Sequence, residues 1–160
     1  MPEQSEVTIR RASSGDLDAI VPLFDAYRQF YRQPGDAALA RRFLRDRFER
    51  GDSVVFVAER NGGDALGFAQ LYPTLSSVSA ARIFVLNDLF VRPEARRYGV
   101  GAQLLSAAAA FGEAAGAVRL TLSTEVTNAA AQALYERNGW KRQTDFYVYE
   151  LALPARGAGQ

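Results

Sequence analysis

The segment from Asn87 to Gly101, which reads NDLFVRPEARRYGVG, combines residue types that suit the binding of a phosphorylated ligand. Its pattern predicts a strand, a short arginine-rich loop and a helix that begins near Gly99. Glycines at positions 99 and 101 let backbone N–H groups approach a ligand closely, and a helix N-terminus attracts anions. The loop adds positive charge from Arg92, Arg96 and Arg97. The segment therefore predicts a pyrophosphate cradle, and the alternative is a helix start in which the glycines only shape a turn.

The chemistry open to this chain is limited by the lack of cysteine and histidine. Without cysteine there is no disulfide, thiolate metal site or cysteine nucleophile. Without histidine there is no Ser-His-Asp triad, imidazole base or ordinary zinc site. Catalysis must therefore use carboxylates, tyrosine, backbone dipoles or water, and we expect no metal.

The cradle differs from two common nucleotide-binding motifs but resembles a third. The P-loop and G-x-G-x-x-G patterns are both absent. The string RRYGVG matches the [Q/R]-x-x-G-x-[G/A] signature of the GNAT N-acetyltransferases, and the later stretch TLSTEVTNAAAQALYERNGW resembles the strand, helix and aromatic closing motif of that family. The resemblance covers roughly residues 7 to 152 and is nearest in pattern to the diamine/histone-type branch.

This resemblance implies acetyl-CoA as co-substrate and an N-acetyltransferase activity. In the family the pantetheine arm lies between two splayed strands and pairs with free backbone groups, which here are those of Leu89, Val91 and the strand end near Ser123. The resemblance implies a cofactor-binding set of Leu89, Phe90, Val91, Arg96, Arg97, Tyr98, Gly99, Val100, Gly101, Ala102 and Asn128.

The resemblance also implies the catalytic residues. Tyr135 is expected beside the sulfur, where a phenol that is protonated at neutral pH can donate to the leaving thiolate; the alternative is a core aromatic. Asp88 and Glu125 are the nearest carboxylates for removing the amine proton, through water and backbone carbonyls, although Asp88 is equally a structural hydrogen-bonding residue. The diamine branch places a glutamate where Asn87 stands, which leaves the base open.

The acceptor pocket is expected from the first two helices and the middle strands. Tyr27, Arg28 and Tyr31, together with Asn87, are its candidate lining, and the alternative is that the two tyrosines pack on the core. Small-molecule amines, amino acids, polyamines and protein or peptide lysines all remain open as acceptors. Since no thiol is present to carry the acetyl group, we expect direct attack in a ternary complex.

The elements that must position these residues follow from hydrophobic periodicity. We expect strands near 7–10, 53–58, 66–72, 83–91, 118–123 and 146–153. A first helix is expected to follow N-caps at 13–16 and to run through 17–27. Further helices are expected at about 36–50, 99–115 and 128–137. The order β-α-α-β-β-β-α-β-α-β predicts an α/β (α+β sandwich) fold with a mixed, mainly antiparallel sheet flanked by helices.

Length and charge limit the remaining classes of function. We interpret the 160 residues as a single domain, 1–160, with a core over about 7–153 and a tail at 154–160. A net charge of +1 does not favour binding of nucleic acid. The sequence shows no apolar run long enough to span a membrane and no secretory signal. We expect a cytoplasmic enzyme, with a homodimer compatible with the resemblance. An acyl-CoA-binding sensor and a structural α/β domain are the alternatives.

Overall fold

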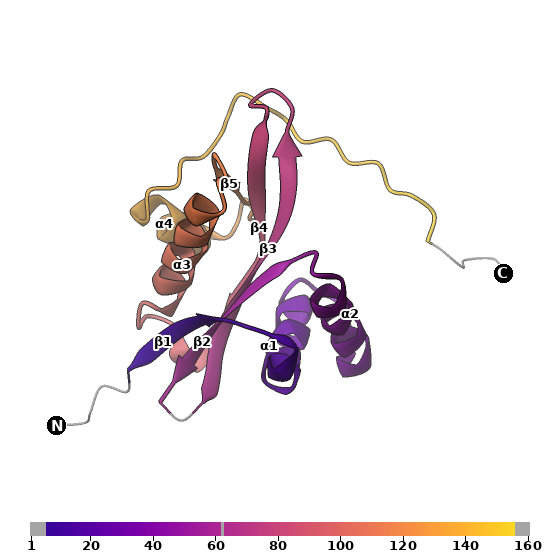
Figure 1. The fold of residues 1–160 in the computed structure, drawn as a ribbon, viewed down its shortest axis with the longest axis vertical. Helices are drawn as coiled ribbons and strands as arrows, with labels where there is room; N and C mark the ends of the chain where they lie inside the picture. Colours follow the sequence, from indigo (N-terminus) through magenta and orange to yellow (C-terminus); the bar gives the residue numbers. More distant parts are fainter. Residues whose placement is uncertain (1–5, 62, 156–160) are drawn as a thin grey trace.

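The computed structural model describes residues 6–61 and 63–155, and its centre is a five-stranded sheet in the order β1-β2-β3-β4-β5 (Figure 1). Neighbouring strands are antiparallel from β1 to β4, whereas β5 is parallel to β4. The strands are β1 (Val7–Arg11), β2 (Val54–Arg60), β3 (Asp64–Ser76), β4 (Ala81–Val91) and β5 (Leu120–Thr121). This arrangement confirms the predicted mixed, mainly antiparallel sheet.

Helices cover both faces of the sheet. The helix α1 (Leu17–Phe30) and the helix α2 (Ala37–Arg50) cover one face, and α3 (Val100–Ala114) covers the other, with α4 (Ala129–Arg137) beside it (Figure 1). Each face of the sheet carries a hydrophobic core, and successive residues of β2 pack into opposite ones: Phe56 packs on the α3 side and Val57 on the α1 and α2 side. Because both faces are buried, β2 and β3 are apolar over most of their length.

Local sequence signals set the helix ends. Asp36 accepts a hydrogen bond from the backbone N–H of Leu39 at 3.0 Å and so caps α2, which ends at Gly51 in the left-handed conformation. Gly99, with φ of 78°, precedes α3. Short 3-10 turns at Ser14–Asp16 and Pro93–Ala95 lead into α1 and into the arginine-rich loop.

The end of the chain differs from the sequence prediction. The expected strand at 146–153 is wrong, because this segment contains no strand and its large apolar side chains are 77–92% exposed. In Figure 1 the segment after α4 extends away from the body of the molecule. A strand needs a neighbour for its backbone hydrogen bonds, and none of the described residues pairs with this one. The strand β5 covers only Leu120–Thr121 and is shorter than the strand expected at 118–123.

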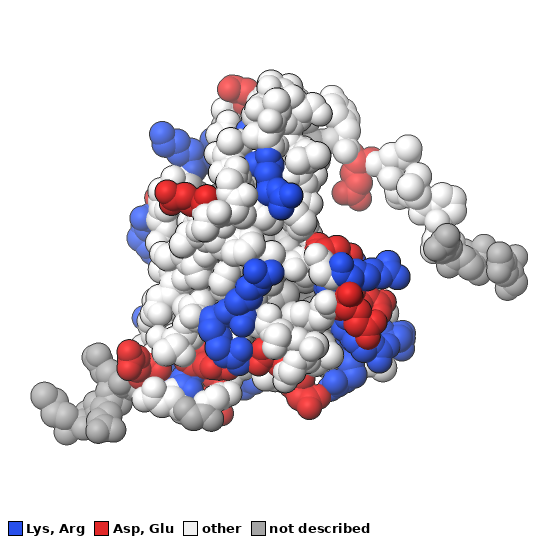
Figure 2. All heavy atoms as spheres, in the orientation of Figure 1, with Lys and Arg blue, Asp and Glu red and all other residues white. Residues whose placement is uncertain are grey.

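The described part of the chain contains no helix that is long and apolar enough to cross a membrane. Both signs of charge intermix on the face shown in Figure 2, most densely over α1 and α2, where acidic and basic side chains alternate. The expected tail at 154–160 falls largely on residues 156–160, which lie outside the described residues, as does Gly62 in the turn between β2 and β3.

Candidate functional site

A β-bulge in β4 marks the centre of the site. Gln70 of β3 faces Asp88, but the next residue, Leu71, faces Leu86, so Asn87 is an extra residue in β4. The pairing of β4 with β5 is restricted to Phe84 and Val85. From residue 86 onwards, therefore, the described residues give β4 no strand neighbour on its β5 side. The two strands separate at the bulge and leave backbone groups of β4 without a strand partner.

Asp88 carries a buried carboxylate next to this bulge. The residue is 2% exposed, and its two carboxylate oxygens accept hydrogen bonds from Gln70 Nε2 at 2.6 Å and from Asn87 Nδ2 at 2.7 Å. Burial raises the pKa of Asp88, and the two amide donors oppose this rise only in part. Asp88 is therefore a carboxylate that holds a proton more readily than an exposed aspartate does.

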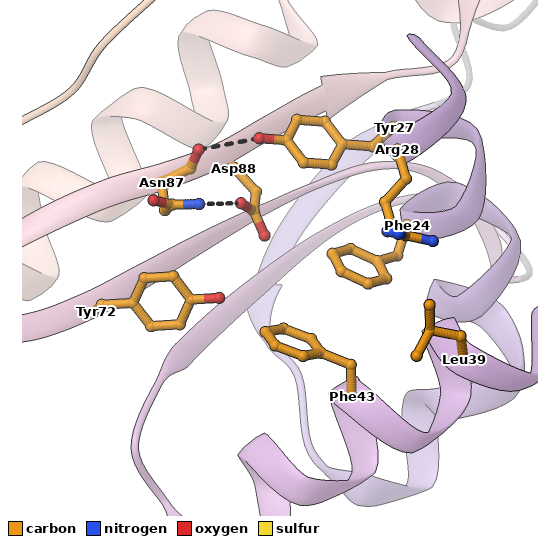
Figure 3. Close-up of a pocket in the computed structure, with 8 residues that line it drawn as sticks. All are labelled: Phe24, Tyr27, Arg28, Leu39, Phe43, Tyr72, Asn87 and Asp88. Carbon is orange, nitrogen blue, oxygen red and sulfur yellow. Dashed lines mark hydrogen bonds between the residues drawn. The ribbon is translucent and has the colours of Figure 1, made fainter. Parts of the chain in front are cut away.

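The carboxylate of Asp88 faces a cavity of about 360 Å³ between α1, α2, β3 and β4 (Figure 3). The walls of this cavity, here called the Asp88 cavity, are mainly apolar: Phe24, Tyr27, Leu39, Phe43 and Tyr72. Its polar lining is formed by Arg28, Asn87 and Asp88. Its size and its few polar groups on apolar walls are typical of a small-molecule site.

Tyrosines surround the same region. The Tyr27 hydroxyl donates a hydrogen bond to the backbone carbonyl of Asn87 at 3.1 Å, which ties α1 to the bulge. The Tyr31 ring packs edge-on against Tyr27, with 5.1 Å between centroids. Burial, first of all, raises the pKa of Tyr27, Tyr31, Tyr72 and Tyr135. Each phenol therefore keeps its proton through the neutral range.

Tyr135 and Glu125 lie outside the cavity lining. Tyr135 packs against the α3-side core next to Trp140. Glu125 is more exposed than Asp88 and forms an ion pair with Arg32 at 3.4 Å. Among the predicted carboxylates, the structure thus brings Asp88 to the cavity and leaves Glu125 at its periphery.

The arginine-rich loop has a conformation suited to exposed backbone amides. Arg97 and Gly99 both have left-handed backbones, with φ of 71° and 78°. Arg96 is held in place, because its Nε donates to the carbonyl of Val91 at 2.9 Å and its guanidinium lies 5.7 Å from the centroid of the Phe90 ring. The Val91 carbonyl is therefore already used within the chain. Tyr98 is 71% exposed, whereas Val100 is buried in the core.

Two predicted cofactor residues also have structural tasks that the sequence did not show. A Cβ at Gly101 would lie 3.1 Å from Leu134 Cδ2, so the missing side chain lets α3 pack against α4. Asn128 caps α4 by accepting a hydrogen bond from the Ala131 N–H at 3.1 Å.

Sequence reasoning missed several residues of the cavity. Tyr72 of β3, and Phe24, Leu39 and Phe43 of the helices, line the cavity but were not among the predicted substrate-binding residues. Gln70, which lies outside the lining and donates to Asp88, was not predicted either. Gln70 had a recognisable signal, since it is a polar residue in a run of buried ones. The helix residues have the spacing of ordinary core positions, so only their placement opposite β3 and β4 identifies them.

Comparison with known proteins agrees with this geometry. The sequence model of the Acetyltransferase (GNAT) family matches residues 20–140. The chain is 51% identical over 150 residues to the uncharacterized N-acetyltransferase YhfO of Bacillus subtilis, covering 94% of this chain and all of that protein. A crystal structure of a probable acetyltransferase superimposes with a TM-score of 0.87 at 39% identity, covering 92% of this chain and 99% of that one. An aminoglycoside N-acetyltransferase in complex with CoA has the same fold, with a TM-score of 0.78 at 21% identity over 96% of this chain and 99% of that one.

Proposed function

We propose, from the premise that the chain belongs to the GNAT family of acetyltransferases, that it transfers the acetyl group of acetyl-CoA to an amine bound in the Asp88 cavity. The N-acetyltransferase class follows from the family and from the relatives named above. The choice of cavity depends on one observation: the buried carboxylate of Asp88 lies where β4 bulges and separates from β5.

Acetyl-CoA is proposed to bind on the β5 side of β4. There the loop from Arg96 to Gly101 would hold the pyrophosphate through backbone N–H groups and the charge of Arg97. The free edge of β4 near Leu89 would pair with the pantetheine arm as an added strand does. The CoA complex of the aminoglycoside N-acetyltransferase with the same fold supports this choice of cofactor.

The acceptor amine is proposed to enter from the opposite face of the sheet. An alkylamine has a pKa near ~10.4, so at pH 7 only about one molecule in 2,500 is the free base. A buried carboxylate beside the amine stabilises the ammonium on binding, and its raised pKa makes it a better proton acceptor. Asp88, directly or through a water molecule, is therefore the proposed proton acceptor, and Glu125 takes a supporting part at the periphery.

The reaction then proceeds in one transfer. The neutral amine nitrogen attacks the thioester carbonyl carbon, and an N–H group at the free edge of β4 stabilises the oxyanion. The C–S bond breaks and the thiolate takes a proton from the Tyr135 hydroxyl. Asp88 has already taken the first proton of the ammonium, and the second proton that the nitrogen loses returns through water to the Tyr135 phenolate. Since the chain has no cysteine or histidine to carry or activate an acyl group, both substrates are bound together.

We also propose that the working molecule is a homodimer. Six large apolar side chains of the C-terminal segment, Phe146, Tyr147, Val148, Tyr149, Leu151 and Leu153, are 77–92% exposed. Exposure of this kind over eight residues is typical of an interface. The segment alternates like a strand, and β5 is an edge strand of the sheet. A second copy of the chain offers that edge, and exchange of the two segments would bury both apolar sets.

The test of the function is an assay of CoA release with a panel of amines, combined with calorimetric titration of acetyl-CoA. We expect acetyl-CoA binding, amine-dependent CoA release and intersecting double-reciprocal lines. Parallel lines with an acetylated protein intermediate would contradict direct attack. Binding of acetyl-CoA without release for any amine would favour a sensor, and no binding at all would leave the glycines as turn residues.

A further inference from the structure

Arg28 is a partly buried cation that forms no ion pair with a described residue. One of its terminal guanidinium nitrogens, Nη1, is buried without a hydrogen-bond partner among the described residues. None of the ion pairs found there includes Arg28. A buried guanidinium nitrogen without an acceptor is unfavourable, so this nitrogen is satisfied by water or by an acceptor group of a bound ligand.

The neighbouring cation, Arg47, also has a buried nitrogen without a hydrogen bond, but unlike Arg28 it has an acidic partner. Arg47 also approaches the cavity wall, but its Nε lies 3.2 Å from the carboxylate of Asp52, and its guanidinium stacks 4.9 Å from the centroid of the Phe43 ring. Arg47 is therefore neutralised within the protein. Arg28 is the cation that lines the cavity and has no acidic partner among the described residues.

The two charged groups of the cavity come from different elements. In Figure 3 the guanidinium of Arg28 projects from α1 and the carboxylate of Asp88 from β4, and the rings of Phe24, Phe43 and Tyr72 surround the space. A polyamine would place a second cation in a cavity that already contains Arg28. An amine that also carries a carboxylate would instead satisfy both groups at once, with its ammonium at Asp88 and its carboxylate at Arg28.

We propose that the acceptor is a small aminocarboxylate, an amino-acid-like molecule with an apolar body, and that Arg28 binds its carboxylate. This inference rests on the proposed function, because it assumes that the amine acetylated is the one bound at Asp88. Arg28 is a binding residue here and takes no part in proton transfer. A guanidinium suits this task because its planar fork can form two parallel hydrogen bonds to a carboxylate.

The test compares acceptors that differ only at the carboxylate. Phenylalanine, as either enantiomer, is assayed with acetyl-CoA beside phenylalaninamide and 2-phenylethylamine, and kcat/KM is measured by CoA release. Loss of the carboxylate is expected to lower kcat/KM about 10- to 100-fold, the range for one charge-assisted hydrogen bond. The same series with the apolar amino acid leucine and its amide checks that the effect does not depend on the aromatic body.

Variants then assign the effect to Arg28. In Arg28→Gln the preference for the carboxylate is expected to fall to within a few-fold of unity, mainly through a higher KM for the amino acids. Arg28→Lys is expected to restore part of the preference. Arg45→Gln, on the exposed side of α2, is the matched control and is expected to leave the preference unchanged.

The outcomes separate this inference from the proposed function. If 2-phenylethylamine and the amides are acetylated as well as the amino acids, or if Arg28→Gln keeps the preference, the aminocarboxylate assignment is wrong while the acetyltransferase proposal stands. If no amine in the panel releases CoA, both proposals fail.

Discussion

Burial acts in the same direction on Tyr135 and Asp88, since it raises the pKa of both groups. The consequences for the proposed reaction are complementary. A phenol with a raised pKa keeps the proton that it must donate to the thiolate. A carboxylate with a raised pKa accepts a proton from an amine more readily than an exposed aspartate does.

Replacement of Tyr135 by phenylalanine tests the proposed acid, because it removes the hydroxyl and keeps the ring against Trp140. General acid catalysis typically contributes about 10²- to 10⁴-fold, so kcat should fall by that order while acetyl-CoA affinity stays constant. Steady-state kinetics and calorimetric titration measure the two quantities. Tyr147→Phe is the control, as it removes a hydroxyl from the C-terminal segment and keeps the apolar ring. A kcat within a few-fold of the parent would show that Tyr135 only packs.

Replacement of Asp88 by asparagine tests whether the buried charge of Asp88 lowers the free energy of unfolding. Because the folded-state pKa is raised, the fold favours the protonated form of Asp88 and is destabilised by the ionised form. The stability that the protonated form contributes is fully present below the unfolded-state pKa and is lost as pH rises through the folded-state pKa. Each unit of pKa difference corresponds to about 1.4 kcal/mol. Urea unfolding should show Asp88→Asn gaining stability relative to the parent from pH 4 to pH 8, while its activity falls. A difference that is constant with pH would contradict a raised pKa.

At the scale of elements, the loop before α3 and the bulge of β4 hold the proposed cofactor site. The left-handed backbone at Arg97 allows a specific test, because asparagine tolerates this conformation and carries no charge. Arg97→Asn should weaken acetyl-CoA binding about 10-fold, and Arg97→Lys should stay within a few-fold of the parent. Calorimetric titration at two salt concentrations measures both. Gly101→Val is a poor test, since a side chain there would meet Leu134.

The path of β4 also depends on Gly67 of β3. A Cβ at this position would lie 2.6 Å from the backbone carbonyl oxygen of Phe90, so β4 would have to move. Gly67→Ala should lower the free energy of unfolding by about 1–3 kcal/mol and reduce activity, because Asp88 and Leu89 precede Phe90 directly. Gly15→Ala is the control, since its nearest contact would be 3.9 Å away. Equal urea midpoints for the two variants would show that β4 accommodates the methyl group.

At the scale of the whole molecule, the C-terminal segment is the most unfavourable part of the surface of a single chain, because its large apolar side chains are exposed to solvent. In Figure 2 the described part of this segment is largely uncharged, in contrast to the charged surface of α1 and α2. A polypeptide that exposes six large apolar residues in a row of eight is expected to cover them. The homodimer proposed above provides that cover without any change in the rest of the fold.

Light scattering coupled to size-exclusion chromatography tests the dimer directly. The parent should elute with twice the mass of the 17.5 kDa chain. The double substitution Val148→Glu and Leu151→Glu should reduce it to the monomer mass, because buried unpaired carboxylates are strongly unfavourable in an interface. Val78→Glu, at the fully exposed tip between β3 and β4, is the control and should remain dimeric. A parent protein of monomer mass at tens of micromolar would contradict the proposal.

The sequence by itself determined the features that depend on local interactions. The caps at Asp36 and Gly51, the turn glycine at position 99 and the apolar periodicity each act over a few residues, so the helix order and the mixed α/β class were predictable. The loop from Arg96 to Gly101 was recognisable for the same reason. Its residues are adjacent in the chain.

Only the tertiary structure decided how the Asp88 cavity and the end of the chain are arranged. The contact of Gln70 with Asp88 depends on the pairing of β3 with β4, and the contact of Tyr27 with Asn87 depends on how α1 packs over the bulge. Both join residues far apart in sequence. The segment at 146–153 has the alternation of a strand, but alternation only favours an extended backbone. Whether that backbone becomes a strand depends on a neighbouring edge, and none of the described residues brings one to it.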